Sequence, residues 1–319
     1  MAPTAPIRAA LFGLVALAGA LDPVMRLETP KGPVFMPQVA LGTWEYGADD
    51  VARAIPLGVA AGFTHIDTAN NYRNQRAVGD AIRASTLREK VFLTTKVPGC
   101  TLTTPTECEA ATARDADDNL AQLGFRNVDL LLLHFPPRPF PWRPREDCAR
   151  LRAQWRALEA AYDAGKARAI GVSNFCPSCF ECLASAGEGE RDPPARIVPA
   201  VNQVQFHVGM GVDPGGIASY CAQRGILLQA YSPLGDARSR DLIDGALVRA
   251  IGEANGRTGV QTSLRYVAQL GYALVTKSAS KAHLEEDIDL FLWALTPSQM
   301  RALGEARSPA ANYSFACVR

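Results

Sequence analysis

Four side chains that could together deliver a proton lie at or just after the ends of short apolar segments: Asp67 in H-I-D-T-A, Tyr72 in N-N-Y-R, Lys96 in T-T-K-V and His134 in L-L-L-H-F. A phenol is a poor acid, with an unperturbed pKa of about 10, so proton donation near neutral pH needs a neighbour that stabilises the phenolate. An ammonium does this, and a paired carboxylate keeps the ammonium charged and in place. An imidazole can donate a hydrogen bond to the acceptor. The four residue types therefore describe a site that protonates a carbonyl oxygen.

The segments before Asp67, Lys96 and His134 are apolar runs typical of buried parallel strands. Helical patterns separate them, near 75–86, 107–123 with Thr106 as candidate N-cap, and 150–164. Further strand candidates lie at 39–44, 167–174, 199–204, 225–232 and 272–278. Eight such units over roughly 290 residues predict an α/β fold, a TIM (α/β)8 barrel whose reactive side chains collect at the C-terminal strand ends. An open doubly wound sheet is the alternative, but no G-x-G-x-x-G follows the first strand.

From about Met25 to its end the chain resembles the aldo-keto reductases, because eight motifs occur in that family's order. They are L-G-T-W (41–44), G-F-T-H-I-D-T-A-N-N-Y (62–72), T-T-K-V (94–97), L-L-L-H-F-P (131–136), G-V-S-N-F (171–175), N-Q-V-Q-F-H (202–207), A-Y-S-P-L-G (230–235) and K-S (277–278). The resemblance implies a single-domain barrel with an N-terminal hairpin that reduces an aldehyde or ketone to an alcohol with a nicotinamide cofactor. The alternative function is a cofactor-binding regulatory barrel with little turnover.

The resemblance also assigns roles to individual residues. Tyr72 is implied to be the general acid, Lys96 to lower its pKa, Asp67 to pair with Lys96, and a neutral His134 to orient the carbonyl. Substrate contacts are implied at Trp44, Phe135 and Trp142. Cofactor contacts are implied at Thr43, Ser173, Asn174, Gln203, Tyr231, Ser232, Leu234, Lys277, Ser278, His283, Glu286 and Asp287.

The sequence departs from the family's pattern at the adenosine end of the cofactor site. Lys277 and Ser278 match residues that meet the 2′-phosphate of NADP, but His283 stands where arginine is usual. Arginine can grip a phosphate with two hydrogen bonds, whereas a neutral imidazole cannot. Asp287 stands where asparagine is common. NADPH is the expected cofactor, and NADH remains possible.

The balance of charged residues limits which classes of binding partner are expected. The chain has 33 basic and 32 acidic residues, so no strong field exists to recruit nucleic acid or an anionic membrane. A small-molecule carbonyl substrate and a monomeric protein are expected.

Residues 1–24 differ from the barrel segment 25–319. Arg8 precedes an apolar run at 9–21, and Ala18-Gly19-Ala20 has the form of a signal-peptidase site. The run is too short to span a membrane. The segment is therefore interpreted either as a signal or targeting peptide, giving a secretory or organellar protein, or as an upstream extension, with translation from Met25 and a cytoplasmic protein.

The sequence contains eight cysteines. A large barrel does not need disulfides to be stable, so free thiols are expected. The spacing of Cys176, Cys179 and Cys182 resembles thiolate metal sites. We expect ordinary helix cysteines there and no metal, with a metal or redox role as the alternative.

Overall fold

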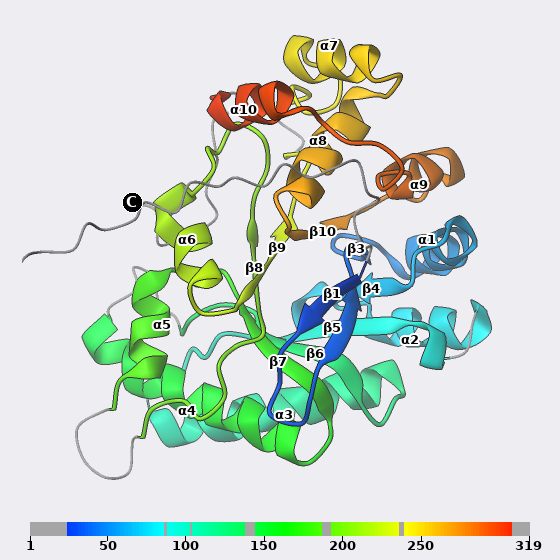
Figure 1. The fold of residues 1–319 in the computed structure, drawn as a ribbon. Coiled ribbons are helices and arrows are strands. Elements are labelled where there is room, and N and C mark those ends of the chain that lie inside the picture. Colours follow the sequence, from blue (N-terminus) through cyan, green and yellow to red (C-terminus); the bar gives the residue numbers. More distant parts are fainter. Residues whose placement is uncertain are drawn as a thin grey trace, which may run out of the picture.

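The computed structural model describes residues 24–85, 88–102, 104–137, 144–186, 193–235 and 239–307. Its centre is a closed barrel of eight parallel strands in the order β10-β3-β4-β5-β6-β7-β8-β9, which confirms the predicted TIM barrel (Figure 1). The strands are β3 (Val39–Gly42), β4 (His65–Asp67), β5 (Phe92–Val97), β6 (Val128–Leu133), β7 (Ala167–Ser173), β8 (Val201–Gln205), β9 (Leu227–Tyr231) and β10 (Ala273–Thr276). All eight predicted strands are present.

Helices surround the barrel and bury its outer face. They are α1 (Ala48–Ala61), α2 (Gln75–Ser85), α3 (Pro105–Leu123), α4 (Pro144–Asp163), α5 (Pro177–Ala184), α6 (Ile217–Ala222), α7 (Ala246–Ala254), α8 (Gly259–Gln269), α9 (Lys281–Ile288) and α10 (Pro297–Glu305), with short 3-10 helices η1 (Asn70–Tyr72), η2 (Arg88–Lys90) and η3 (Pro214–Gly216). Strands β5 and β6 are buried along their whole length, as expected for strands covered on both faces. Among the described residues no helix is both long and apolar enough to cross a membrane.

An antiparallel hairpin, β1 (Val24–Leu27) and β2 (Val34–Pro37), lies across one end of the barrel (Figure 1). Leu27 and Met36 from the hairpin are buried in one cluster with Phe92 and Ala273, which begin β5 and β10. The hairpin therefore closes the N-terminal mouth of the barrel. This leaves the C-terminal strand ends as the open face.

Two helix starts differ from the sequence-based expectation. Helix α3 is capped by Thr104, not Thr106, because the Thr104 hydroxyl accepts from the Glu107 backbone N–H while the Glu107 carboxylate accepts from the Thr104 backbone N–H. Pro105 then occupies the first helical position, where its missing N–H costs nothing. Helix α4 begins at Pro144 rather than near residue 150.

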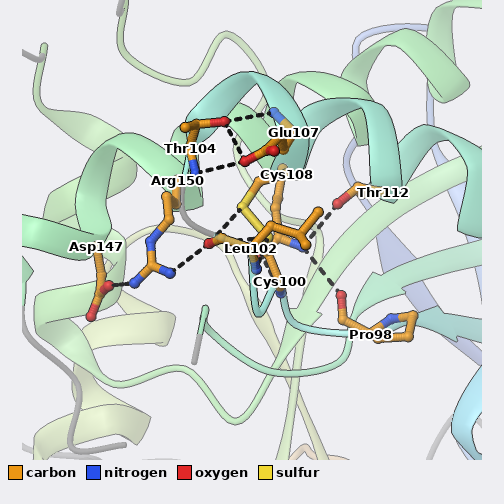
Figure 2. The surroundings of a disulfide bond; sticks show 10 residues. Pro98, Cys100, Leu102, Thr104, Glu107, Cys108, Thr112, Asp147 and Arg150 are labelled. Carbon is orange, nitrogen blue, oxygen red and sulfur yellow. Dashed lines mark hydrogen bonds and ion pairs between the residues drawn. A yellow bond between two sulfur atoms is a disulfide. The ribbon is translucent and has the colours of Figure 1, made fainter. Parts of the chain in front are cut away.

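The expectation of free thiols was wrong. Cys100 and Cys108 form a disulfide between the loop after β5 and the first turns of α3, and Cys148 and Cys182 form one between α4 and α5 (Figure 2 shows the first). Fold size removes the need for such bonds but does not prevent them where the topology places two thiols together. Cys179 is buried, and no described residues form a cluster that could hold a metal ion.

Candidate active site

The four side chains predicted to deliver a proton come together at the C-terminal end of the barrel. Asp67 is the last residue of β4, Lys96 lies near the end of β5, and His134 follows β6 directly. Lys96 Nζ donates to Asp67 Oδ1 at 2.6 Å, to the Thr68 carbonyl at 3.0 Å and to the Tyr72 hydroxyl oxygen at 3.0 Å. The ammonium thus uses all three protons, and the phenol retains its own proton for another acceptor.

Burial controls the charges of this group. Lys96 and Asp67 are buried. Burial lowers the pKa of Lys96, but the Asp67 carboxylate and the Tyr72 oxygen raise it by more, so it lies above the ordinary lysine value. Burial raises the pKa of Tyr72, Lys96 lowers it and Asp67 raises it, with a net increase. Tyr72 is therefore protonated at neutral pH, and Lys96 is the charge that stabilises the phenolate once the proton leaves.

Two aromatic side chains lie beside the Tyr72 ring. The ring centroids of Tyr72 and His134 are 5.8 Å apart, edge to face, and those of Tyr72 and Trp44 are 4.8 Å apart. His134 also stacks on Phe135 at 4.5 Å. Trp44 is 50% exposed, so it offers apolar surface at the mouth of the site. The third predicted substrate contact, Trp142, lies outside the described residues.

The residues predicted to hold the nicotinamide carboxamide form one hydrogen-bonded group at neighbouring strand ends. Asn174 donates to the His134 carbonyl and to the Ser173 hydroxyl, both at 3.0 Å, and its Oδ1 accepts from the Tyr231 hydroxyl at 2.8 Å. Asn174 has a left-handed backbone, with φ of 61°, a conformation that asparagine tolerates better than most residues. The contacts fix the Tyr231 ring, which is only half-buried, beside the ends of β6 and β7.

Gln203 is buried inside the barrel. Its Nε2 donates to Asp67 Oδ2 and to Gln229 Oε1, each at 2.8 Å. Thr43 donates to the Asp67 carbonyl at 3.1 Å, so Asp67 is held through both its main chain and its side chain. Gln229 was not singled out in the sequence. The available signal was an amide inside an otherwise apolar strand, I-L-L-Q-A-Y.

Ser232 and Leu234, predicted to contact the cofactor, lie half-buried just after β9, and Ser232 has a positive φ of 50°.

The residues predicted for the adenosine end gather after β10 and on α9. Lys277 is exposed and donates to the Trp44 carbonyl at 2.9 Å, Ser278 is half-buried beside it, and His283 is exposed on α9. Glu286 accepts a hydrogen bond from the Thr258 hydroxyl. Asp287 is buried, and its Oδ2 accepts from the Thr276 hydroxyl at 2.8 Å. Asp287 therefore points inward, toward the end of β10.

A cavity of about 360 Å³ adjoins the site. Its lining includes Asn71 and Phe135, the chain neighbours of Tyr72 and His134, together with Cys100, Leu102 and Asp115. Figure 2 shows how the loop that forms this wall is fixed: the Leu102 carbonyl accepts from Arg150 at 2.9 Å, next to the Cys100–Cys108 disulfide.

Comparison with known proteins agrees with this geometry. A model of the Aldo/keto reductase family matches residues 38–308. Aldo-keto reductase family 4 member C11 of Arabidopsis thaliana is 32% identical over 83% of this chain and 84% of its own, and morphine 6-dehydrogenase of Pseudomonas putida is 33% identical over 85% and 88%. The crystal structure of an aldo-keto reductase from a Medee basin deep-sea metagenome library superposes with a TM-score of 0.74 at 27% identity, over 91% of this chain and 98% of that one. The chain therefore belongs to the aldo/keto reductase family.

Proposed function

We propose that this protein reduces an aldehyde or ketone to an alcohol with NADPH, with Tyr72 as the general acid. The observation that carries the proposal is the buried contact of Lys96 with both Asp67 and the Tyr72 hydroxyl at the open end of the barrel. A reduced nicotinamide, when bound, would supply a hydride for the carbonyl carbon. The Tyr72 proton goes to the carbonyl oxygen, so a carbonyl, a hydride and a proton give one alcohol.

Each neighbour of Tyr72 has a defined task in this scheme. Lys96 stabilises the phenolate left after proton transfer, and Asp67 keeps the Lys96 ammonium charged and oriented. His134 and Trp44 flank the phenol and orient the carbonyl against it. The phenol is regenerated when the phenolate takes up a proton from solvent.

The residues present fit a nicotinamide dinucleotide. Tyr231 has a half-buried ring fixed by Asn174, which suits stacking on a flat heterocycle. Lys277 is an exposed cation beside Ser278 at the end of β10, where a phosphate would find charge and a hydroxyl. The carboxamide would be held by Ser173, Asn174 and Gln203. The rest of the cofactor-binding site would be lined by Thr43, Ser232, Leu234, His283, Glu286 and Asp287.

Substitution of Tyr72 tests the function directly. Tyr72→Phe keeps the ring and removes the proton donor, so kcat should fall by about 10²- to 10⁴-fold with NADPH and 4-nitrobenzaldehyde. NADPH binding, followed by nicotinamide fluorescence, should stay nearly unchanged. Tyr266→Phe is the matched control, because the buried Tyr266 hydroxyl has no hydrogen-bond partner among the described residues.

Two results would contradict the proposal. If Tyr72→Phe kept more than about half of the wild-type kcat, Tyr72 would not be the acid. If the wild-type protein bound NADPH but reduced no member of a panel of aliphatic, aromatic and sugar aldehydes and ketones, the regulatory-barrel alternative would hold.

We also propose that the protein is exported. Disulfides form and persist in oxidising compartments and are rare in the cytosol. The bonds Cys100–Cys108 and Cys148–Cys182 therefore favour the signal-peptide interpretation of residues 1–20 over translation from Met25.

A further inference from the structure

A hydrogen bond crosses the interior of the barrel directly beneath the proton-donating group. Asp67 lies on β4 and Gln203 on β8, and these strands are four places apart in the ring of eight, on opposite sides. Even so, Gln203 Nε2 lies 2.8 Å from Asp67 Oδ2. Both residues are only 2% exposed. Gln203 thus holds the second oxygen of the carboxylate whose first oxygen holds Lys96.

The carboxylate fixes which way the Gln203 amide faces. An ionised carboxylate only accepts hydrogen bonds, so the amide nitrogen of Gln203 must face Asp67. The second hydrogen on that nitrogen then points to Gln229 Oε1, 2.8 Å away on the adjacent strand β9. Gln203 and Gln229 are register partners, which places both side chains on the inner face. The amide orientations of the two residues are therefore both set by Asp67.

This arrangement has a stability cost at Gln229. The side chain is completely buried, and because its oxygen faces Gln203, its Nε2 has no hydrogen-bond partner among the described residues. A buried N–H without a partner is unfavourable, so an apolar residue at this position would suit the core better. The register neighbour on β10 is Ala273, which offers no acceptor. The amide at 229 has a physical purpose only through the oxygen that it presents to Gln203.

We propose that Gln229 is a positioning residue for carbonyl reduction: it fixes the amide of Gln203, which in turn holds Asp67 against Lys96 and Tyr72. This inference rests on the proposed function. A donor on Asp67 Oδ2 draws negative charge away from Tyr72, so it favours the phenolate and makes Tyr72 a better acid. The titratable groups that face Tyr72 are Asp67 on β4, Lys96 on β5 and His134 after β6. The effect of Gln229 reaches Tyr72 through Asp67 alone.

The pH profile of Gln229→Met tests this proposal. Methionine matches the size of glutamine but presents no oxygen to Gln203, so kcat should fall about threefold to tenfold. The alkaline limb of kcat/KM, where Tyr72 loses its proton, should move to higher pH. Gln38→Met is the matched control: Gln38 is a buried amide that precedes β3 at the opposite end of the barrel, bonded to Ala268 and Tyr272 carbonyls. It should lose stability while its pH profile overlays that of the wild type.

A double-mutant cycle separates positioning from general destabilisation. If Gln229 acts through Gln203, adding Gln229→Met to Gln203→Met should change neither kcat nor the alkaline limb. Multiplicative effects of the two substitutions, or a Gln229→Met profile that matches Gln38→Met, would overturn the proposal.

A second cycle needs no turnover, so it distinguishes this proposal from the proposed function. Unfolding free energies from urea titration should show coupling between Gln229→Met and Asp67→Ala, although the two side chains do not bond to each other in the structure. The coupling should vanish when Gln203 is methionine. Coupling without any carbonyl reduction would leave the positioning network intact and refute only the reductase function. Additive free energies would refute the network.

Discussion

At the scale of single residues, the site depends on one ammonium whose three protons are all committed. Lys96 donates to Asp67, to the Thr68 carbonyl and to Tyr72, and its side chain is fully buried. Burial alone would neutralise a lysine, and the carboxylate beside it reverses that tendency. Burial also raises the pKa of Tyr72, so its phenol is protonated at neutral pH. The proposed mechanism therefore assigns proton donation and phenolate stabilisation to different residues.

His283 should weaken the preference for NADPH over NADH. An imidazole in place of the usual arginine removes or weakens one charge-assisted contact of about 1.5–3 kcal/mol. At about 1.4 kcal/mol per tenfold change, this lowers the affinity for NADPH by a factor of about ten or more. We expect His283→Arg to lower the KM for NADPH and to leave that for NADH nearly unchanged.

Steady-state kinetics with both cofactors would check this. No change in the KM for NADPH in His283→Arg would show that this side chain does not face the 2′-phosphate.

Asp287 makes a separate prediction about stability. Burial raises its pKa to about 6, with the Thr276 hydrogen bond and His283 lowering it in part. A carboxyl group whose pKa is higher in the folded state stabilises the fold while protonated. That contribution is full below the unfolded pKa of about 4 and is lost as the pH rises through about 6. Above pH 6 the ionised group costs about 3 kcal/mol at most.

Asp287→Asn should therefore stabilise the protein at about pH 7.5 and change little at about pH 4, because asparagine is neutral and keeps an acceptor for Thr276. Urea unfolding of both proteins at the two pH values measures this. A gain of equal size at both pH values would mean that ionisation is not its source.

At the scale of elements, apolar runs predicted the strands well and the helix starts less well. Strands such as V-D-L-L-L-L are buried on both faces, so their apolar pattern is continuous and their polar ends mark the C-terminal face. The cap of α3 was misplaced by two residues because both Thr104 and Thr106 suit the position, and the reciprocal bond with Glu107 decides between them. The disulfides could not be read from the sequence, since eight cysteines allow many pairings and only the fold brings Cys148 and Cys182 together.

The two disulfides should contribute unequally to stability. Chain-entropy arguments for sequence separations of 8 and 34 residues give about 2.5 and about 3.8 kcal/mol. Cys148→Ser should therefore lower the unfolding free energy more than Cys108→Ser. Cys108→Ser should, in contrast, affect activity more than Cys148→Ser does. Cys100 lines the cavity beside Phe135, and the same loop after β5 carries the Leu102 carbonyl that Arg150 binds. We expect Cys108→Ser to raise the KM for bulky aldehydes.

Urea unfolding would compare the unfolding free energies of the two variants. Kinetics with a small and a bulky aldehyde would compare their KM values. Cys221→Ser serves as the control, because Cys221 is a buried free thiol on α6. If Cys108→Ser left the KM values of both aldehydes at the wild-type level, the disulfide would not shape the substrate side.

At the scale of the whole molecule, barrel closure creates contacts that local sequence patterns do not reveal. Asp67 and Gln203 are 136 residues apart, yet they bond across the interior because β4 and β8 face each other in the ring. Family motifs placed both residues in the site, but neither motif shows that the two side chains meet. The role of Gln229 was missed for the same reason, since it follows from a neighbour on β8 and not from its own segment.

The oxidised cysteines and the N-terminal sequence lead to one prediction about the whole protein. Residues 9–21 form an apolar run whose last residues include Ala18-Gly19-Ala20, which has the form of a signal-peptidase site. Export through an oxidising compartment would account for both this run and the two disulfides.

Protein purified from its native source should therefore begin at Leu21 by N-terminal sequencing and should lack reactive thiols at Cys100, Cys108, Cys148 and Cys182. Residues 25–319 produced in a reducing cytoplasm should carry those four thiols reduced and should unfold at lower urea concentration until they are oxidised. A native chain that begins at Met25 with the four thiols reduced would show that the protein is cytoplasmic, and an intact Met1 would refute both interpretations of the N-terminal segment.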